Sequence, residues 1–285
     1  VFVMINHMGF EEDVKLANQL PANSADLIIG GHSHTKVDKK QIHNGIMITQ
    51  AERKLKYATL IKLVVNSEGK VDREMQLLNV GKNGNSRSDI QAMVDVYNNN
   101  PALTEIIATA EDDFSSYEEV GYLMCDAIRI SVGADIALTN PGGVRMPSLV
   151  KGPVRTKDAY EIDPFGNEMV LFKLSGHEMR SLFFNAFKFD ENLPIYPSGI
   201  STRYILSSDG KLKDVELFTT EGKPLDMEKS YSVVISNYMA SVYKYDHKDV
   251  GQGLFRTTAE ATIDYLKELK NIPSYRGMQR VEIVK

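Results

Sequence analysis

The sequence lacks three features that would each assign it to a class of protein. It has a single cysteine, Cys125, which excludes an intrachain disulfide and a zinc site built from cysteines. It has no run near the roughly 18 apolar residues of a membrane-spanning helix. Its net charge of −5 argues against a surface that binds nucleic acid through bulk positive charge. We therefore expect neither a nucleic-acid polymer nor a membrane span.

The composition that remains is ordinary for a globular protein. Apolar residues make up 42% and charged residues 25% of the 285 positions. This length suffices for two domains or for one large domain. The chain begins within a strand-like apolar run and without an initiator methionine, so we expect it to be a mature or trimmed fragment.

Hydrophobic patterning predicts an α/β protein with two parts. Residues 1–85 alternate strand and helix patterns, residues 86–102 form a linker and helix, and residues 103–285 can bury a core of their own. We expect the sheet of the first part to be half-built and completed by upstream sequence. The predicted elements of residues 1–102 are strands at 1–5, Asp26–Ile29, Ile46–Gln50, Ala58–Val65 and Arg73–Val80, helices at Glu12–Leu20 and Asp89–Asn98, and a linker at Gly81–Ser88.

Three histidines follow two of the predicted strands. His7 comes after the first strand, and His32 and His34 follow the glycine pair after the second. Alternate residues of an extended segment point the same way, so His32 and His34 should reach one metal centre. Two strands joined by a helix bring all three histidines to one end of a sheet, where α/β proteins bind ligands. The alternative is that the histidines have no metal-binding role.

The order of motifs resembles the 5'-nucleotidase/2',3'-cyclic phosphodiesterase family. Asn6-His7-Met8-Gly9 and Gly30-Gly31-His32-Ser33-His34 are similar to the last two metal-binding motifs of calcineurin-like metallophosphoesterases. Three later blocks resemble the family's C-terminal domain: Asn140-Pro141-Gly142-Gly143-Val144-Arg145, Asp163-Pro164-Phe165-Gly166-Asn167 and Asn237-Tyr238-Met239-Ala240. The resemblance implies a partial metallophosphatase β-sandwich with helices, followed by a separate mixed α/β nucleotide-binding domain.

For the first part, the resemblance implies a pair of divalent metal ions. His7 and His32 would ligate one ion and His34 the other, and imidazoles suit zinc, manganese or iron. The pair would activate water and polarise a phosphate ester. The family's Asp-x-His, Gly-Asp and Gly-Asn-His-Glu motifs precede the Asn-His-x-Gly motif and have no equivalent here. We therefore expect a partial metal site, no catalytic residue and no hydrolysis by this chain alone.

For the second part, the resemblance implies a nucleotide site. Phe165 and Tyr238 match two aromatic residues that sandwich the base, and Arg145 offers a forked, permanently charged donor to phosphate. Asn140 offers an amide, and Gly142-Gly143 permit a close backbone approach. Without the resemblance, the two aromatic residues would be interpreted as core residues and Arg145 as a surface ion-pair partner.

Two functions follow as alternatives. In the first, the chain is the C-terminal portion of a 5'-nucleotidase-like phosphohydrolase, and upstream sequence or another polypeptide supplies the missing metal ligands. In the second, it is a non-catalytic module that binds nucleotides without metal. A purely structural domain would leave the clustering of glycine, asparagine, arginine and aromatic residues unexplained. Members of the family are commonly periplasmic, so the resemblance also implies a location outside the cytoplasm.

Overall fold

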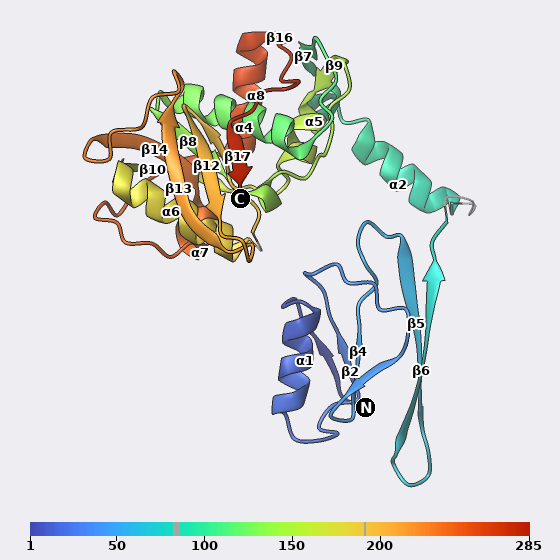
Figure 1. Ribbon diagram of the computed structural model, residues 1–285. Coiled ribbons are helices and arrows are strands. Elements are labelled where there is room, and N and C mark those ends of the chain that lie inside the picture. Colours follow the sequence, from blue (N-terminus) through green and yellow to red (C-terminus); the bar gives the residue numbers. More distant parts are fainter. Residues whose placement is uncertain (82–85, 191) are drawn as a thin grey trace. The chain divides into compact units, whose positions relative to one another are not determined.

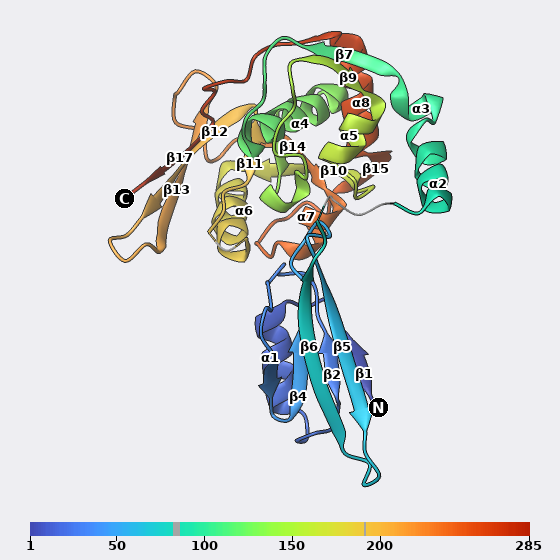
Figure 2. The ribbon, with the colours of Figure 1, turned by 90° about the vertical axis from the view of Figure 1, so that its right-hand side faces the viewer.

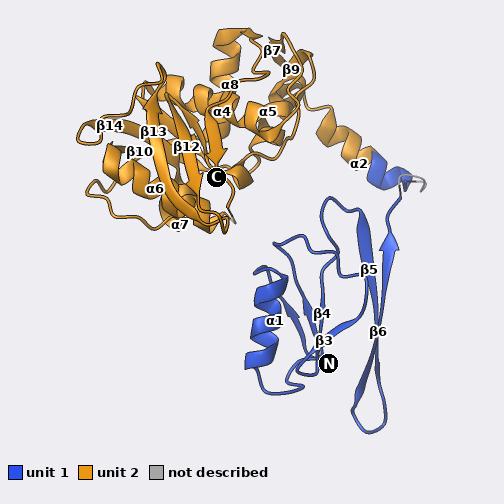
Figure 3. Cartoon of the chain, viewed as in Figure 1, with its two compact units in different colours: residues 1–91 blue, residues 92–285 orange. Residues whose placement is uncertain are grey.

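A computed structural model describes residues 1–81, 86–190 and 192–285. The chain divides within helix α2 (Ser88–Asn98) into unit 1, Val1–Gln91, and unit 2, Ala92–Lys285 (Figure 3). This division falls inside the region predicted as linker and helix. Four residues of the predicted linker, 82–85, lie outside the described residues. Each unit has a hydrophobic core of its own.

Unit 1 contains a four-stranded sheet in the order β1-β2-β4-β3. Strands β1, β2 and β4 run parallel, and β3 runs antiparallel to β4. Helix α1 (Phe10–Gln19) connects β1 to β2 and packs on the sheet around Ala17 and Ile28 (Figure 1). The strands are β1 (Val3–Ile5), β2 (Leu27–Ile29), β3 (Gln41–His43) and β4 (Ile46–Thr49). The strand–helix–strand order predicted for the first 30 residues is confirmed.

A long hairpin of β5 (Tyr57–Val65) and β6 (Val71–Asn79) completes unit 1. Its residues alternate between half-buried and exposed, as the period of two in a strand requires. An ion pair ties the hairpin to the sheet, because the Arg73 guanidinium lies 2.8 Å from a carboxylate oxygen of Asp26. The two predicted strands are confirmed, with bounds that differ by one or two residues.

Unit 2 is built on a five-stranded sheet in the order β11-β8-β14-β10-β15. Strand β8 runs parallel to β14, whereas β10 runs antiparallel to β14 and to β15. The strands are β8 (Ile136–Thr139), β10 (Glu168–Ser175), β11 (Tyr196–Ser198), β14 (Ser230–Ser236) and β15 (Gln252–Thr257). This mixed sheet confirms the predicted α/β class.

The central strands are buried on both faces. Val233 and Ile235 of β14 pack in one core with helix α6 (Gly176–Phe189), while Val234 packs in another with α4 (Tyr117–Val132) and α8 (Thr258–Leu269). Figure 2 shows α4 and α6 with strands of this sheet between them. Phe183 and Phe187 of α6 are fully buried in the first of these cores.

Smaller elements surround this layered centre. Two further three-stranded sheets have the orders β13-β12-β17 and β16-β7-β9. Their strands are β7 (Ile106–Ala110), β9 (Gly152–Arg155), β12 (Ile200–Leu206), β13 (Leu212–Thr219), β16 (Asn271–Ile272) and β17 (Val281–Val284). The short helices are α3 (Pro101–Thr104), the 3-10 helix η1 (Pro141–Gly143), α5 (Thr156–Ile162) and α7 (Asn237–Val242). In the described part of the chain, no helix is both long and apolar enough to cross a membrane.

Candidate functional site

The sheet topology of unit 2 brings three segments to one edge. Asn140 directly follows β8, and Tyr238 lies in the first turn after β14. Because these strands are parallel neighbours, their carboxyl ends lie at the same edge. Strand β10 begins at this edge, since its Met169 pairs with Ser236 at the end of β14. The loop 163–167, which carries Phe165 and leads into β10, therefore lies there too.

Asn140 and Gly143 form a tightly packed turn at this edge. The Asn140 side chain is buried, and its backbone carbonyl accepts a hydrogen bond of 2.9 Å from the Gly143 amide. A Cβ atom on Gly143 would lie only 2.8 Å from Oδ1 of Asn140. A Cβ on Gly142 would lie 3.4 Å from Nδ2 of Asn140, an ordinary contact distance. Close packing therefore requires glycine at 143 and not at 142.

Two aromatic rings and one cation are accessible beside this turn. Phe165 is 47% and Tyr238 40% exposed, so the interpretation of both as core residues is wrong. The Arg145 guanidinium lies 4.9 Å from the centroid of the Phe165 ring. Burial and the Asp190 carboxylate raise the pKa of Tyr238, while the Arg145 charge acts in the opposite direction. Arg145 thus acts electrostatically on both rings, and it forms no ion pair with the residues that the structure describes.

Two pairs of residues, to which the sequence analysis gave no role, hold these aromatic residues in place. The Thr258 hydroxyl donates a hydrogen bond to the Asp163 carboxylate under the Phe165 loop. The hydroxyl of Tyr243, at the end of α7, donates a hydrogen bond to Asp190, at the end of α6. Asp163 has a sequence signal, since it opens the Asp-Pro-Phe-Gly-Asn block. Its partner Thr258 is 95 residues away and has none.

In unit 1 the structure brings His7 and His32 together. Their ring centroids are 5.2 Å apart in an edge-to-face arrangement. The expected extended geometry of His32 and His34 is wrong, because their φ angles of 75° and 55° are left-handed. A turn causes this difference, since the Ser33 amide donates to the Gly31 carbonyl at 3.0 Å.

A buried carboxylate lies under this histidine-bearing loop. Asp13 of α1 is fully buried, and one oxygen accepts a 2.9 Å hydrogen bond from the Asn6 amide. The other oxygen, Oδ2, has no hydrogen-bond partner within the described residues. A Cβ on Gly30 would lie 2.2 Å from that oxygen, so the loop requires glycine there. The sequence signal that was missed is an aspartate six residues after His7.

The donor set of unit 1 fits a metal ion only in part. Neutral imidazoles are suitable ligands for a zinc-like divalent ion, and His7 and His32 are adjacent. Within residues 1–81, 86–190 and 192–285, however, no three histidine, cysteine, aspartate or glutamate side chains form a group that could hold a metal. Unit 1 therefore contributes two neighbouring imidazoles rather than a complete binding site.

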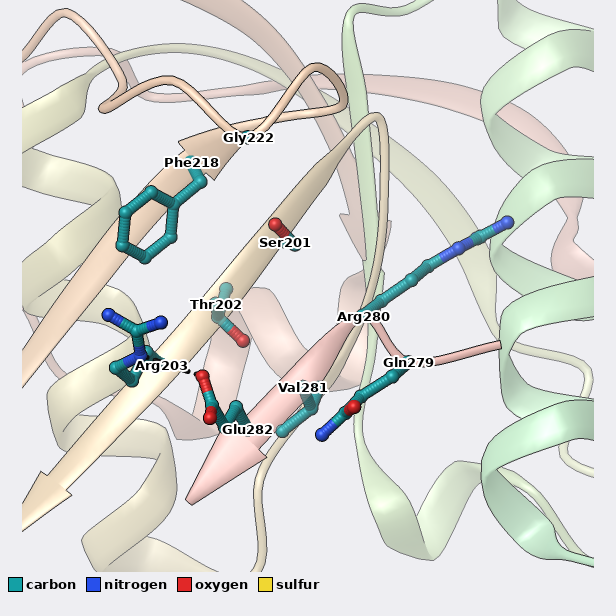
Figure 4. A pocket seen from close by; sticks show the side chains of 9 residues that line it. All are labelled: Ser201, Thr202, Arg203, Phe218, Gly222, Gln279, Arg280, Val281 and Glu282. Carbon is teal, nitrogen blue, oxygen red and sulfur yellow. Dashed lines mark hydrogen bonds and ion pairs between the residues drawn. The ribbon is translucent and has the colours of Figure 1, made fainter. Parts of the chain in front are cut away.

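A cavity of about 270 Å³ lies elsewhere, on the sheet of β12, β13 and β17 (Figure 4). Its charges are paired with one another, because Arg203 lies 2.7 Å from Glu282 and stacks on Phe218. The Arg280 side chain runs away from Glu282 in Figure 4 and pairs with Asp126. The cavity is lined by Ser201, Thr202, Arg203, Phe218, Gly222, Gln279, Arg280, Val281 and Glu282, none of which is a predicted site residue.

Comparison with known proteins identifies the class. Residues 102–244 match the family model of the 5'-nucleotidase C-terminal domain, and the chain belongs to this family. The matched segment includes the turn at Asn140, both aromatic rings and Arg145.

Particular relatives cover nearly the whole chain. Endonuclease YhcR of Bacillus subtilis is 25% identical over 95% of this chain and 23% of its own length. Protein UshA of Escherichia coli is 25% identical over 85% of this chain and 53% of its own length. The crystal structure of a 5'-nucleotidase precursor from Thermus thermophilus matches with a TM-score of 0.73 and 27% identity, over 99% of this chain and 64% of that one. The chain thus spans about half or less of the length of these two curated relatives.

Proposed function

We propose that the chain is the C-terminal portion of a 5'-nucleotidase-like phosphohydrolase that removes phosphate from nucleotides. Unit 2 recognises the nucleotide and unit 1 supplies part of a two-metal site. The observation that carries the proposal is the convergence of Asn140, Arg145, Phe165 and Tyr238 at one edge of a sheet. The family membership and the nucleotidase among the structural matches support it.

Each residue of this edge has a role that its chemistry allows. The Phe165 and Tyr238 rings offer accessible faces on which a base stacks, and stacking tolerates different bases. Arg145 offers two parallel N–H donors to a phosphate group. Its guanidinium now lies over the Phe165 ring in a cation–π contact. At an exposed site such a contact contributes only about 0.5–1 kcal/mol. A phosphate can therefore draw the guanidinium away at small cost. Asn140 and the glycine turn offer amide groups to the sugar or phosphate.

In unit 1, His7 and His32 would hold one divalent ion and His34 would belong to the second. When bound, such a pair supplies Lewis-acid activation of water and of the phosphate ester. The missing carboxylate and histidine ligands come from another part of the enzyme, in the same polypeptide or in a separate one. We place the enzyme in the periplasm or otherwise outside the cytoplasm.

The alternative is a non-catalytic nucleotide-binding module. It is favoured by one observation, that unit 1 has no cluster of three metal ligands among its described residues. The two functions differ in what metal does. The module binds nucleotides and needs no metal, whereas the complete enzyme hydrolyses them only with metal.

Calorimetric titration with adenosine and AMP tests the nucleotide site. We expect Tyr238→Ala to weaken binding of both ligands by about 1–3 kcal/mol, the contribution of one stacked aromatic ring. The matched control is Tyr160→Ala, because Tyr160 is equally exposed on α5 and outside the site. An equal loss in both variants, or no binding by the native chain, would contradict the proposal.

A further inference from the structure

The loop that carries Phe165 is attached to the start of α8 through a buried carboxylate. Asp163 is 2% and Thr258 1% exposed, and the Thr258 hydroxyl donates to Oδ2 of Asp163. The Thr258 amide donates to the carbonyl of Asn167 at 2.9 Å. One residue of α8 therefore holds both ends of the five-residue loop.

The second oxygen of Asp163 acts inside the loop. Oδ1 lies 3.4 Å from the Phe165 amide, in the arrangement by which aspartate stabilises a local turn. Gly166 follows with a φ of +64°, so the chain turns sharply directly after the ring. Phe165 itself is half exposed and, apart from Arg145, no described side chain forms a ring or cation contact with it. The position of the ring is therefore determined by the loop backbone.

Asp163 is an expensive residue to bury for a purely structural purpose. It has no ion-pair partner among the described residues, and burial raises its pKa despite the opposing hydrogen bond from Thr258. An apolar side chain would avoid the cost of burying a carboxylate. The Asp163 carboxylate instead accepts hydrogen bonds from two groups, the Thr258 hydroxyl at the start of α8 and the backbone amide of Phe165.

Resting on the proposed function, we propose that Asp163, together with Thr258, is a positioning residue for nucleobase recognition. The pair fixes the backbone of loop 163–167 and thereby keeps the Phe165 ring in the orientation in which a base stacks on it. Loss of the pair leaves the phosphate end of the site intact and lowers the affinity for the base.

The first test separates the base from the phosphate. We expect Asp163→Ala to raise the Kd for adenosine and AMP by about tenfold, within the range for one stacked ring, and to leave ribose 5-phosphate binding unchanged. Asp163→Asn should retain most of the affinity, because its amide offers an acceptor to the Phe165 N–H and a donor to the Thr258 oxygen.

The control is Thr262→Val, one turn further along α8. Thr262 is 1% exposed, and its hydroxyl donates to the Thr258 carbonyl at 2.8 Å rather than to a residue of the loop. It should leave all three affinities unchanged. Equal losses in Asp163→Ala and Thr262→Val, or an adenosine affinity that Asp163→Ala does not alter, would overturn the positioning role.

A second measurement needs no ligand. The chain has no tryptophan, so the Phe165→Trp variant carries a single indole at the position in question. In this background we expect Asp163→Ala to increase the fast local component of time-resolved anisotropy, and Thr262→Val to leave it unchanged. Unchanged anisotropy after Asp163→Ala would refute the inference. If the native chain binds no adenosine, the proposed function fails, and the anisotropy still decides whether Asp163 positions the loop.

Discussion

Among single residues, the two glycines of the turn after β8 differ in what they permit. Gly142 and Gly143 are adjacent in the sequence. Only at Gly143 would an added Cβ atom overlap Oδ1 of Asn140. The motif identified both glycines as a place of close backbone approach. Which of them is essential depends on how the turn folds back on the asparagine.

This difference gives a prediction for the pair. We expect Gly143→Ala to introduce strain of about 1–3 kcal/mol, displace the Asn140 side chain and weaken AMP binding. Gly142→Ala should be tolerated, since its new Cβ has ordinary contact distances. Calorimetry with AMP and thermal unfolding of both variants check this. Equal AMP affinities in the two variants would contradict the assignment of Asn140 to the site.

The resemblance suggested the chemical groups of the proposed site, and the bare sequence could not have done so. Phe165 and Tyr238 are exposed although aromatic residues of this kind are usually buried. Their exposure depends on the positions of loop 163–167 and α7, and the packing of the sheet determines these positions. The supporting residues Asp163, Thr258 and Asp190 were missed because their partners are 53 to 95 residues away.

Among the elements, α7 is short and depends on contacts at its two ends. The six-residue helix is capped at its start, where Ser236 Oγ accepts from the Met239 amide at 3.2 Å. At its end, the buried Tyr243 donates its hydroxyl to Asp190. A helix of this length is not stable on its own, so these contacts determine the position of Tyr238.

We therefore expect Tyr243→Phe to destabilise the protein by about 1–3 kcal/mol, because it leaves the half-buried Asp190 carboxylate without its donor. Adenosine affinity should fall as well. Tyr245→Phe is the control, since the Tyr245 hydroxyl is buried and has no hydrogen-bond partner in the described residues. Its removal should cost nothing in urea unfolding. A larger loss for Tyr245→Phe than for Tyr243→Phe would refute this explanation.

A buried ion pair joins α4 to the segment before β17. Arg280 forms two 2.7 Å hydrogen bonds with the two oxygens of Asp126, and Tyr275 donates a third at 2.7 Å. Both charged side chains are more than four-fifths buried. Removing one partner leaves an uncompensated charge, so Arg280→Met should cost about 3–5 kcal/mol of unfolding free energy.

The same pair predicts a pH dependence. Burial alone would raise the pKa of Asp126, but the hydrogen bonds and charge of Arg280 outweigh it, so the net pKa lies below the ordinary value. The unfolded state then binds the proton first, and native stability falls as the pH drops below about 3.9 towards the lower folded pKa. In Arg280→Met the buried Asp126 carboxylate has no arginine partner and becomes protonated more readily. The difference in unfolding free energy between this variant and the native sequence should therefore shrink between pH 6 and pH 3. Urea unfolding across this range measures both variants, and a constant deficit would contradict the proposed pairing.

On the scale of the whole molecule, unit 1 has a sheet edge that pairs with no further strand of the described residues. Strand β1 forms this edge, and its Ile5 side chain is 82% exposed. Such an edge can pair with a further strand. This fits the proposal that the remaining metal ligands belong to another part of the enzyme.

We therefore expect the chain to bind AMP but to release no phosphate from it, with or without Mn²⁺ or Zn²⁺. Chelation should leave adenosine affinity unchanged, because the base site is built from unit 2 alone. Phosphate release by malachite green assay and calorimetry in EDTA measure the two expectations. Metal-dependent release that His32→Ala abolishes would show instead that this chain holds a complete centre.

The sequence by itself determined the α/β class, the elements of the first 80 residues apart from the short strand β3 and, through its motifs, the family. These features depend on local periodicity and on residues that are adjacent in the chain. Tertiary structure alone decided which residues share the site edge, because parallel pairing of β8 with β14 places residues about 100 apart side by side. It also decided the left-handed turn at His32, where Gln50 bonds Gly31 and Ser33 on either side of it. It decided the support of Phe165 by Thr258 as well, since both features depend on contacts between distant segments.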